Sequence, residues 1–243
     1  MAEHGQQIWY EEARSKGYFF HRQIWHLIAL LILVPVTWAF AAPVMGQGAF
    51  LGIPDTAWFW LSVGLPILHQ VIVWIVFRLQ MGWGTLSKTF GRADLIVWGV
   101  IFLPLIIARP FLLVGLAKAT QSSLVLPRVF SVFLGIMLLL PSLYTIWSVF
   151  RYFGFVRAMV GDHFRVRFRK MPLVRKGAFR YSQNAMYAFA FFLLWSIALI
   201  HRSQAALSVA LFQHAYIWVH YYCTEEPDMQ IIYSEKLDKH SPN

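Results

Sequence analysis

Six apolar segments, separated by polar or charged stretches, set the pattern of this chain. The first four run from Ile24 to Pro43, Ala57 to Phe77, Leu95 to Leu116 and Val129 to Phe150. Each has about the 20 residues that a helix needs to cross the hydrocarbon core of a membrane. The pattern therefore predicts four transmembrane helices over residues 24–150, preceded by an N-terminal segment at residues 1–23. Arg78 is expected to end the second helix.

The last two apolar segments, Met186–Ile200 and Ala206–Tyr222, are shorter, and His201–Gln204 joins them. This spacing predicts a tight helical hairpin. Pro227 suits the first turn of a further helix, which is expected to be amphipathic and to lie at the membrane interface. Its apolar face comprises Met229, Ile232, Tyr233 and Leu237. The predicted fold class is thus all-α, a polytopic membrane helical bundle with about six hydrophobic segments.

Composition supports the membrane interpretation. The chain is 58% hydrophobic and only 13% charged, whereas soluble domains are about 25% charged. The formal net charge of +10 does not indicate nucleic acid, because Lys and Arg in a membrane protein usually mark cytoplasmic loops. The single cysteine, Cys223, excludes an intrachain disulfide.

The positions of the basic residues predict an orientation. Nine of the 21 Lys and Arg residues lie between Arg151 and Arg180, whereas the loops on the other side carry Lys118, Arg128 and Arg202. By the positive-inside rule, both termini are expected in the cytoplasm, as in a multi-pass integral membrane protein. Residues 151–243 then comprise a cytoplasmic basic loop, the hairpin and the C-terminal helix.

Two interpretations of the basic loop are open. Its arginines could serve topology alone and contact anionic lipid headgroups. Alternatively, a few of them bind the carboxylate of a cofactor or the phosphate of a lipid, for which the guanidinium fork is suited. Arg165, Arg167 and Arg169 alternate and would share one face of an extended segment.

Adjacent carboxylates at Glu225 and Glu226 directly follow the last apolar segment. They could form a helix start with Pro227, because acidic side chains interact well with the N-terminal end of a helix. They could instead meet a cationic group or ribose hydroxyls of a ligand, because carboxylates beside an apolar run are costly without a partner. The two interpretations are compatible.

Histidines raise the possibility of a metal site, since His26, His69, His214 and His220 fall in or near apolar segments. However, His214 and His220 are six residues apart, which does not direct two ligands from a helix to one metal. No H-E-x-x-H, G-x-x-x-x-G-K-[ST], G-x-S-x-G or C-x-x-C motif is present. We therefore predict hydrogen-bonded core histidines and no metal site.

The C-terminal quarter carries an ordered set of short motifs. Gly177-Ala178-Phe179-Arg180-Tyr181 precedes Asn184-Ala185-Met186-Tyr187, Ser203 lies in the hairpin turn, and Glu225-Glu226-Pro227 leads to Ile231-Ile232-Tyr233. Together these resemble the small integral-membrane methyltransferases, which include phosphatidylethanolamine N-methyltransferases and isoprenylcysteine carboxyl methyltransferases. The chain departs from the common form of that family at Gln183, Asn184 and Ala185, where the family has Arg, His and Pro.

This resemblance implies that S-adenosylmethionine is the methyl donor and that residues 151–243 form the catalytic region. It also implies a membrane lipid as acceptor, with the amine of a phosphatidylethanolamine-type headgroup expected first. Tyr187 is expected to act in catalysis, and His163 is a candidate general base. The residues expected to bind the cofactor are Arg180, Asn184, Tyr187, Glu225 and Glu226.

Three alternatives are consistent with the same motifs. The protein could retain the fold without catalysis, or it could be a sterol-reductase-like membrane enzyme that uses NADPH. It could also methylate another small lipophilic acceptor, such as an isoprenylcysteine carboxylate or a thiol. Stabilisation by NADPH rather than by S-adenosylmethionine would identify the reductase. The sequence gives no indication of the oligomeric state.

Overall fold

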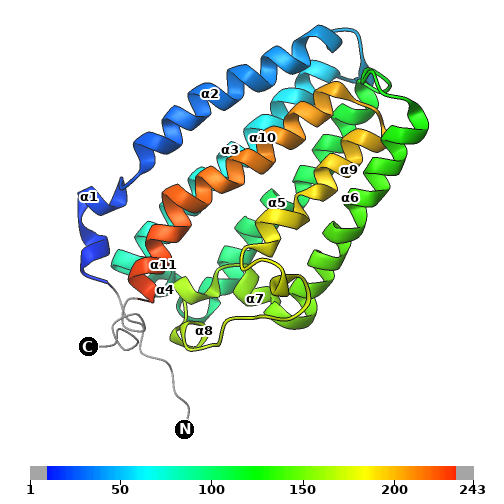
Figure 1. The fold of residues 1–243 in the computed structure, drawn as a ribbon. Helices are drawn as coiled ribbons and strands as arrows, with labels where there is room; N and C mark the ends of the chain where they lie inside the picture. The colour runs from blue at the N-terminus through cyan, green and yellow to red at the C-terminus, as the bar shows by residue number, and fades with distance from the viewer. Residues whose placement is uncertain (1–9, 234–243) are drawn as a thin grey trace.

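The computed structural model describes residues 10–233, which form a bundle of long helices with most of the short helices at one end (Figure 1). The long helices are α2 (Gln23–Ala41), α3 (Asp55–Trp83), α5 (Asp94–Ala119), α6 (Arg128–Ser148), α9 (Phe192–Ile200) and α10 (Gln204–His220). The short helices are α1 (Lys16–Phe19), α4 (Thr85–Phe90), α7 (Phe155–Ala158), α8 (Val166–Arg169) and α11 (Glu226–Ile232). Two antiparallel two-residue strands, β1 (Ala49–Phe50) and β2 (Ile53–Pro54), lie between α2 and α3.

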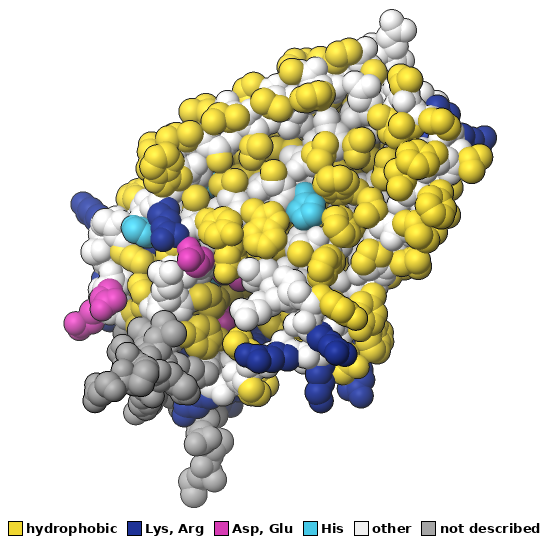
Figure 2. Space-filling model, in the orientation of Figure 1, with side chains coloured by type: hydrophobic (Ala, Val, Ile, Leu, Met, Phe, Trp, Pro, Cys, Tyr) yellow, Lys and Arg dark blue, Asp and Glu magenta, His cyan; other side chains and the backbone are white. Residues whose placement is uncertain are grey.

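Within residues 10–233, four helical stretches are long and apolar enough to cross a membrane: Lys16–Val44, Asp55–Trp83, Thr85–Ala119 and Arg128–Phe153. Met186–Ile200 is a shorter apolar helix. Hydrophobic side chains cover the middle of the face seen in Figure 2, and Lys and Arg side chains gather toward its ends. The helical membrane bundle predicted from the sequence is therefore confirmed.

Helix α3 is longer than predicted, because Arg78 does not end it. The helix continues to Trp83 and ends at Gly84, whose positive φ of 66° is the left-handed conformation that commonly follows a helix. Arg78 is fully buried and forms an ion pair with Asp228. The ion pair allows a charged side chain to lie within the helix, and its partner comes from a distant part of the chain.

Helices α6 and α9 pack closely through small residues. A Cβ atom on Gly135 would lie 2.8 Å from Cγ1 of Ile200, so a larger residue there would force the Ile200 side chain to shift. Ser131 donates to the Leu199 carbonyl and Ser196 to the Gly135 carbonyl, both at 2.7 Å. Small residues and serine hydrogen bonds are the usual contacts between membrane helices, because lipid tails offer no hydrophobic drive for association.

Helix α10 occupies the centre of the bundle and contacts α2, α3, α5 and α9. Its buried face, which includes Phe212 and Tyr216, packs with Phe59 of α3 and Leu113 of α5. The predicted hairpin of α9 and α10 is present, and the Ser203 side chain caps α10 by accepting a hydrogen bond from the Ala206 amide at 3.0 Å.

The predicted C-terminal helix is present, and its apolar side packs on the protein. A π-helical turn at Tyr221–Glu225 joins α10 directly to α11. Ile232 is buried and packs with Ala13 and Met81, with Tyr233 at the edge of the same cluster. The amphipathic face therefore packs on protein, and Leu237, also expected on it, lies outside the described residues.

Candidate active site

Tyr187 and Glu225 meet where two π-helical turns face each other. Tyr187 belongs to the turn Met186–Ala190 that precedes α9, and Glu225 ends the turn Tyr221–Glu225 that follows α10. The Tyr187 hydroxyl donates a hydrogen bond to Oε2 of Glu225, and both residues are half-buried. π-Helical turns often occur at functional sites. The structure thus brings together two residues that the sequence motifs predicted separately.

Aromatic rings surround this pair. The Tyr187 ring lies 6.0 Å from the Trp218 ring and 5.9 Å from the Tyr221 ring, measured between centroids, in edge-to-face arrangements. Aromatic faces carry partial negative charge and attract cations, most strongly where water is excluded. A carboxylate that is hydrogen-bonded to Tyr187, next to two further aromatic rings, suits a cationic ligand group.

Burial raises the pKa of the Glu225 carboxyl to about 7, even though the hydrogen bond from Tyr187 acts in the opposite direction. Glu225 lies beyond α10, at the end of the bundle that carries α11. A carboxyl with a pKa near neutrality changes its charge readily in response to a bound cation, which is typical of functional sites.

Glu226 is engaged differently from Glu225. Its Oε2 atom accepts a hydrogen bond from Nη1 of Arg22 at 2.6 Å, and its Oε1 atom accepts one from Gln230 at 3.1 Å. Both side chains of the Arg22–Glu226 ion pair are about one-third exposed, so the pair contributes little to stability. Of the two predicted carboxylates, only Glu225 faces Tyr187.

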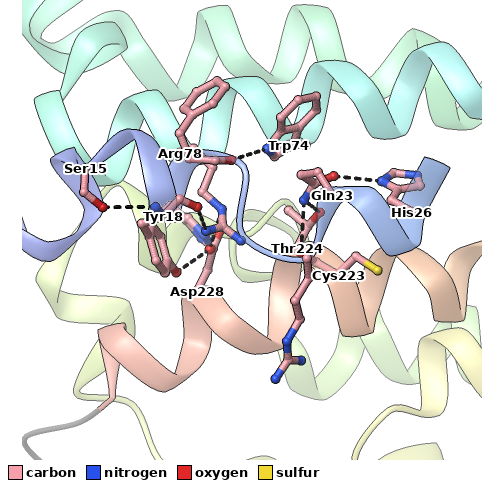
Figure 3. Close-up of polar contacts among 12 residues, drawn as sticks. Ser15, Tyr18, Gln23, His26, Trp74, Arg78, Cys223, Thr224 and Asp228 are labelled. Carbon is pink, nitrogen blue, oxygen red and sulfur yellow. Dashed lines mark hydrogen bonds and ion pairs between the residues drawn. The ribbon is translucent and has the colours of Figure 1, made fainter. Parts of the chain in front are cut away.

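Residues 10–23, which we call the N-terminal clasp, hold the end of the α10–α11 helix. Pro227 has no amide hydrogen, so it cannot serve as a donor within the helix. The clasp donates hydrogen bonds to two nearby carbonyls. The Tyr222 carbonyl accepts one from the Arg22 side chain at 2.9 Å, and the Cys223 carbonyl accepts one from the Gln23 side chain at 3.0 Å. Figure 3 shows Gln23 between Thr224 and His26. The clasp thus satisfies backbone groups that the helix leaves open.

Asp228 is the centre of a buried charge cluster that sequence reasoning missed. Its Oδ1 atom lies 2.9 Å from Nε of Arg78 and accepts a hydrogen bond from the Tyr18 hydroxyl at 2.8 Å (Figure 3). The Arg78 guanidinium also lies 4.0 Å from the centre of the Tyr18 ring and donates to the Tyr18 carbonyl at 2.7 Å. The cluster ties α3, α11 and the clasp together.

His163 lies on the other side of Asp228. Its Nε2 atom is 3.4 Å from Oδ2 of Asp228, its Nδ1 atom is 3.7 Å from Oδ1 of Asp162, and its ring stacks on Phe77. Burial alone would lower the pKa of His163, but the two carboxylates outweigh it and raise that pKa to about 8. His163 is fully buried, so this geometry favours a role in holding Asp228. Its role as a general base stays a prediction.

Residues 177–181, which we call the lead-in loop, contact α6 through Gly177. Gly177 has a φ of 60°, and a Cβ atom there would lie 2.5 Å from Oγ of Ser148. That same hydroxyl accepts a hydrogen bond from the Ala178 amide at 3.0 Å. The glycine therefore permits a close approach that seats the loop before Tyr187.

Replacing Gly177 with alanine is expected to destabilise the protein by about 1–3 kcal/mol, because it adds both backbone strain and a steric clash. Thermal unfolding in detergent micelles measures the change. Gly52 also has a positive φ, of 75°, but a Cβ atom at that position would have no neighbour within 4 Å. Gly52→Ala should therefore cost less, and equal losses in the two variants would exclude the contact with Ser148 as the cause.

Arg180 lies in the lead-in loop, and Asn184 follows it. Arg180 is exposed and forms no ion pair within residues 10–233. The Asn184 carbonyl accepts hydrogen bonds from the amides of Tyr187 and Ala188 at 3.0 and 2.9 Å, while its side chain is half-buried. Both side chains remain available for a ligand, and their predicted roles in cofactor binding stay predictions.

The three alternating arginines do not share one face, because the loop turns into α8 rather than staying extended. Arg165 forms a fork of two hydrogen bonds to Asp94, at 2.5 and 2.6 Å. Arg169 is buried and donates to the Asp162 carbonyl at 2.7 Å. Arg167 is exposed over the Phe168 ring. Two of these arginines thus hold the loop, and one faces outward.

The histidines of the apolar segments have side-chain neighbours. His26 bonds to Gln23 and Tyr216 at 3.0 and 2.7 Å, and His69 lies 2.5 Å from Arg109. His214 stacks on Phe191. Between residues 10 and 233, no group of three His, Cys, Asp or Glu side chains is arranged to hold a metal ion.

Comparison with known proteins matches residues 130–236 to the model of the phospholipid methyltransferase family. The search of curated proteins and the search of solved structures found no match. The matched stretch contains Tyr187, Glu225 and the lead-in loop, and it confirms the resemblance seen in the sequence. The chain is therefore an integral membrane protein whose residues 130–236 match the phospholipid methyltransferase family model.

Proposed function

We propose that the protein transfers a methyl group from S-adenosylmethionine to a membrane lipid, with the amine of a phosphatidylethanolamine-type headgroup on the cytoplasmic leaflet as the first candidate acceptor. The family match supports methyl transfer. The observation that carries the donor assignment is the Tyr187–Glu225 pair among aromatic rings. The predicted topology, with both termini in the cytoplasm, is part of this proposal.

The residues present fit such a donor, which carries a cationic sulfonium, an ammonium and a carboxylate. Glu225 supplies a carboxylate whose partner among the described residues is a neutral hydroxyl, so it can pair with a cation. Tyr187, Trp218 and Tyr221 supply ring faces for the same charge. Arg180, exposed in the lead-in loop, supplies a guanidinium for the carboxylate.

When bound, S-adenosylmethionine supplies an electrophilic methyl group. The chain then has to align the acceptor nitrogen with that methyl and exclude water, because orientation supplies much of the acceleration of a displacement reaction. The Tyr187 hydroxyl fixes the Glu225 carboxylate, and the buried Asp228–Arg78 pair fixes the helix that carries it. A headgroup ammonium must also lose its proton before reacting. His163 stays the predicted base, and only its neutral form, which prevails above its pKa of about 8, can accept that proton.

The arginines of residues 151–180 suit a lipid partner. Arg151, Arg167 and Arg175 are exposed, and they belong to the segment around α7 and α8, which lies at the same end of the bundle as α11 (Figure 1). Basic residues at a cytoplasmic membrane surface attract anionic headgroups, each by about 1 kcal/mol. We propose that these residues hold the loop against the membrane and do not select the acceptor.

The test is direct. Purified protein in phosphatidylethanolamine nanodiscs is incubated with methyl-labelled S-adenosylmethionine, and lipid extracts are analysed for labelled headgroups. Label in an N-methylated headgroup is expected, together with donor binding by calorimetry. Absence of both would contradict the proposal. Thermal stabilisation by NADPH but not by S-adenosylmethionine would favour a reductase, and label in a methyl ester or thioether would reassign the acceptor.

A further inference from the structure

Two adjoining hollows lie at the end of α6 far from Tyr187 and Glu225. The first has a volume of about 350 Å³ and is lined by polar and basic side chains, including Arg128, His201 and Arg202. The second, of about 390 Å³, is lined by Arg128 and by apolar residues of α6 at positions 129, 132, 133 and 136. Arg128 and Val132 line both. A basic mouth therefore continues into an apolar groove along the helix.

Hydrogen bonds join the two connections that form the mouth, between α5 and α6 and between α9 and α10. The Ser122 amide donates to the His201 carbonyl at 3.2 Å, and the Leu124 amide donates to the Arg202 carbonyl at 2.8 Å. The buried hydroxyls of Thr120 and Ser203 also meet at 2.6 Å. These contacts thus join the backbones of the α5–α6 and α9–α10 connections, from which the basic side chains extend.

Arg202 occupies a backbone position that normally selects glycine. Its φ is 53°, and it follows the end of α9, where the Arg202 and Ser203 amides donate to the Leu199 and Ala198 carbonyls at 3.0 and 2.9 Å. This pattern is the Schellman motif, whose left-handed residue is usually glycine because a Cβ atom is unfavourable there. Keeping arginine at this position favours a function for its side chain.

Among the described residues, the charges of the mouth lack an acidic partner, and the Arg202 guanidinium donates only to the Leu124 carbonyl, at 3.4 Å. Across residues 10–233, neither Arg128 nor Arg202 forms an ion pair, and no Asp or Glu lines either hollow. Lys and Arg side chains are visible at the upper right end of the molecule in Figure 2, beside a hydrophobic surface. The adjoining α6 surface is apolar, with Val129 83% exposed and Phe133 55% exposed.

We propose that this groove binds an anionic glycerophospholipid of the surrounding leaflet. Its phosphate lies between Arg128 and Arg202, and one acyl chain follows Val132, Phe133 and Ile136. Guanidinium groups suit phosphate oxygens, and basic pockets between membrane helices are known to bind anionic headgroups. The site is distinct from the Tyr187–Glu225 pair and does not depend on methyl transfer.

Native mass spectrometry of the detergent-solubilised full chain tests the site with phosphatidylglycerol and, as the neutral comparison, phosphatidylcholine. Wild-type protein should retain phosphatidylglycerol preferentially. The double variant Arg128→Gln/Arg202→Gly should bind it at least about tenfold more weakly, because each basic residue contributes roughly fivefold. Lys16→Gln, an exposed position at the start of α1 at the other end of the bundle, is the matched control and should retain wild-type affinity.

Arg202→Gly separates binding from folding, because glycine relaxes the backbone while it removes the cation. Its thermal unfolding midpoint should equal or exceed that of the wild type. Val132→Trp keeps both arginines but fills the groove, and it should also lose the lipid. A photoreactive acyl chain should crosslink to α6 at residues 132–136.

Three results would overturn the proposal. These are equal retention of phosphatidylcholine, unchanged phosphatidylglycerol affinity in the double variant, and crosslinks confined to other helices. Inorganic phosphate at millimolar concentration should not displace the lipid, since the apolar groove contributes to binding. Displacement by phosphate alone would likewise contradict a lipid site.

Discussion

Asp228→Asn is expected to destabilise the protein by about 3–5 kcal/mol, because it leaves the buried Arg78 guanidinium without a counter-charge. Both side chains of the pair are inaccessible to solvent. Thermal unfolding in detergent micelles should show a fall in midpoint of roughly 6–20 °C for a chain of this size.

Two further variants separate charge from packing. Glu226→Gln removes a carboxylate two residues earlier, but its ion pair with Arg22 is partly exposed and should contribute at most about 1 kcal/mol. Arg78→Met combined with Asp228→Asn removes the lone charge and should recover part of the stability. If Asp228→Asn and Glu226→Gln had equal effects, the buried cluster would not be a major source of stability.

Glu225→Gln is expected to weaken binding of S-adenosylmethionine roughly 10- to 100-fold, the effect of losing about 1.5–3 kcal/mol from a charged hydrogen bond. Calorimetry of donor binding measures it directly. Glu226→Gln should cost less, because that carboxylate already pairs with Arg22. A larger loss in Glu226→Gln would reverse the assignment of the two carboxylates.

The same proposal predicts a pH dependence in the wild type. The pKa of Glu225 is raised to about 7 by burial, so the carboxyl is neutral below that pH and charged above it. Affinity for the cationic donor should therefore rise as pH increases through 7, whereas affinity in Glu225→Gln should be flat over this range. The thermal midpoint of this variant should stay near that of the wild type.

The helices could be predicted from the sequence, because apolar runs of membrane length have few alternatives. The sequence motifs predicted Tyr187 and Glu225 as separate site residues, but they did not predict the contact between them. Their contact depends on π-helical turns in both helices, and no local pattern marks such a turn.

The buried cluster was missed for a different reason. Arg78 looked like the end of a helix because its partner, Asp228, lies far along the chain and outside any apolar segment. The sequence did contain one indication of this cluster, because Arg78 is a charged residue at the edge of an apolar segment. Asp228 directly follows Glu225-Glu226-Pro227, and nothing in the sequence distinguishes it from these neighbouring acidic residues.

The Arg78–Asp228 pair also bears on the order of assembly. Helix α3 is synthesised and inserted long before α11, so the Arg78 guanidinium enters the membrane region with no Asp228 carboxylate to meet it. The ion pair of Arg78 can form only after α11, which carries Asp228, has been synthesised. The Arg78–Asp228 ion pair and the Tyr187–Glu225 contact therefore both depend on the last part of the described chain, because each needs a residue that follows α10.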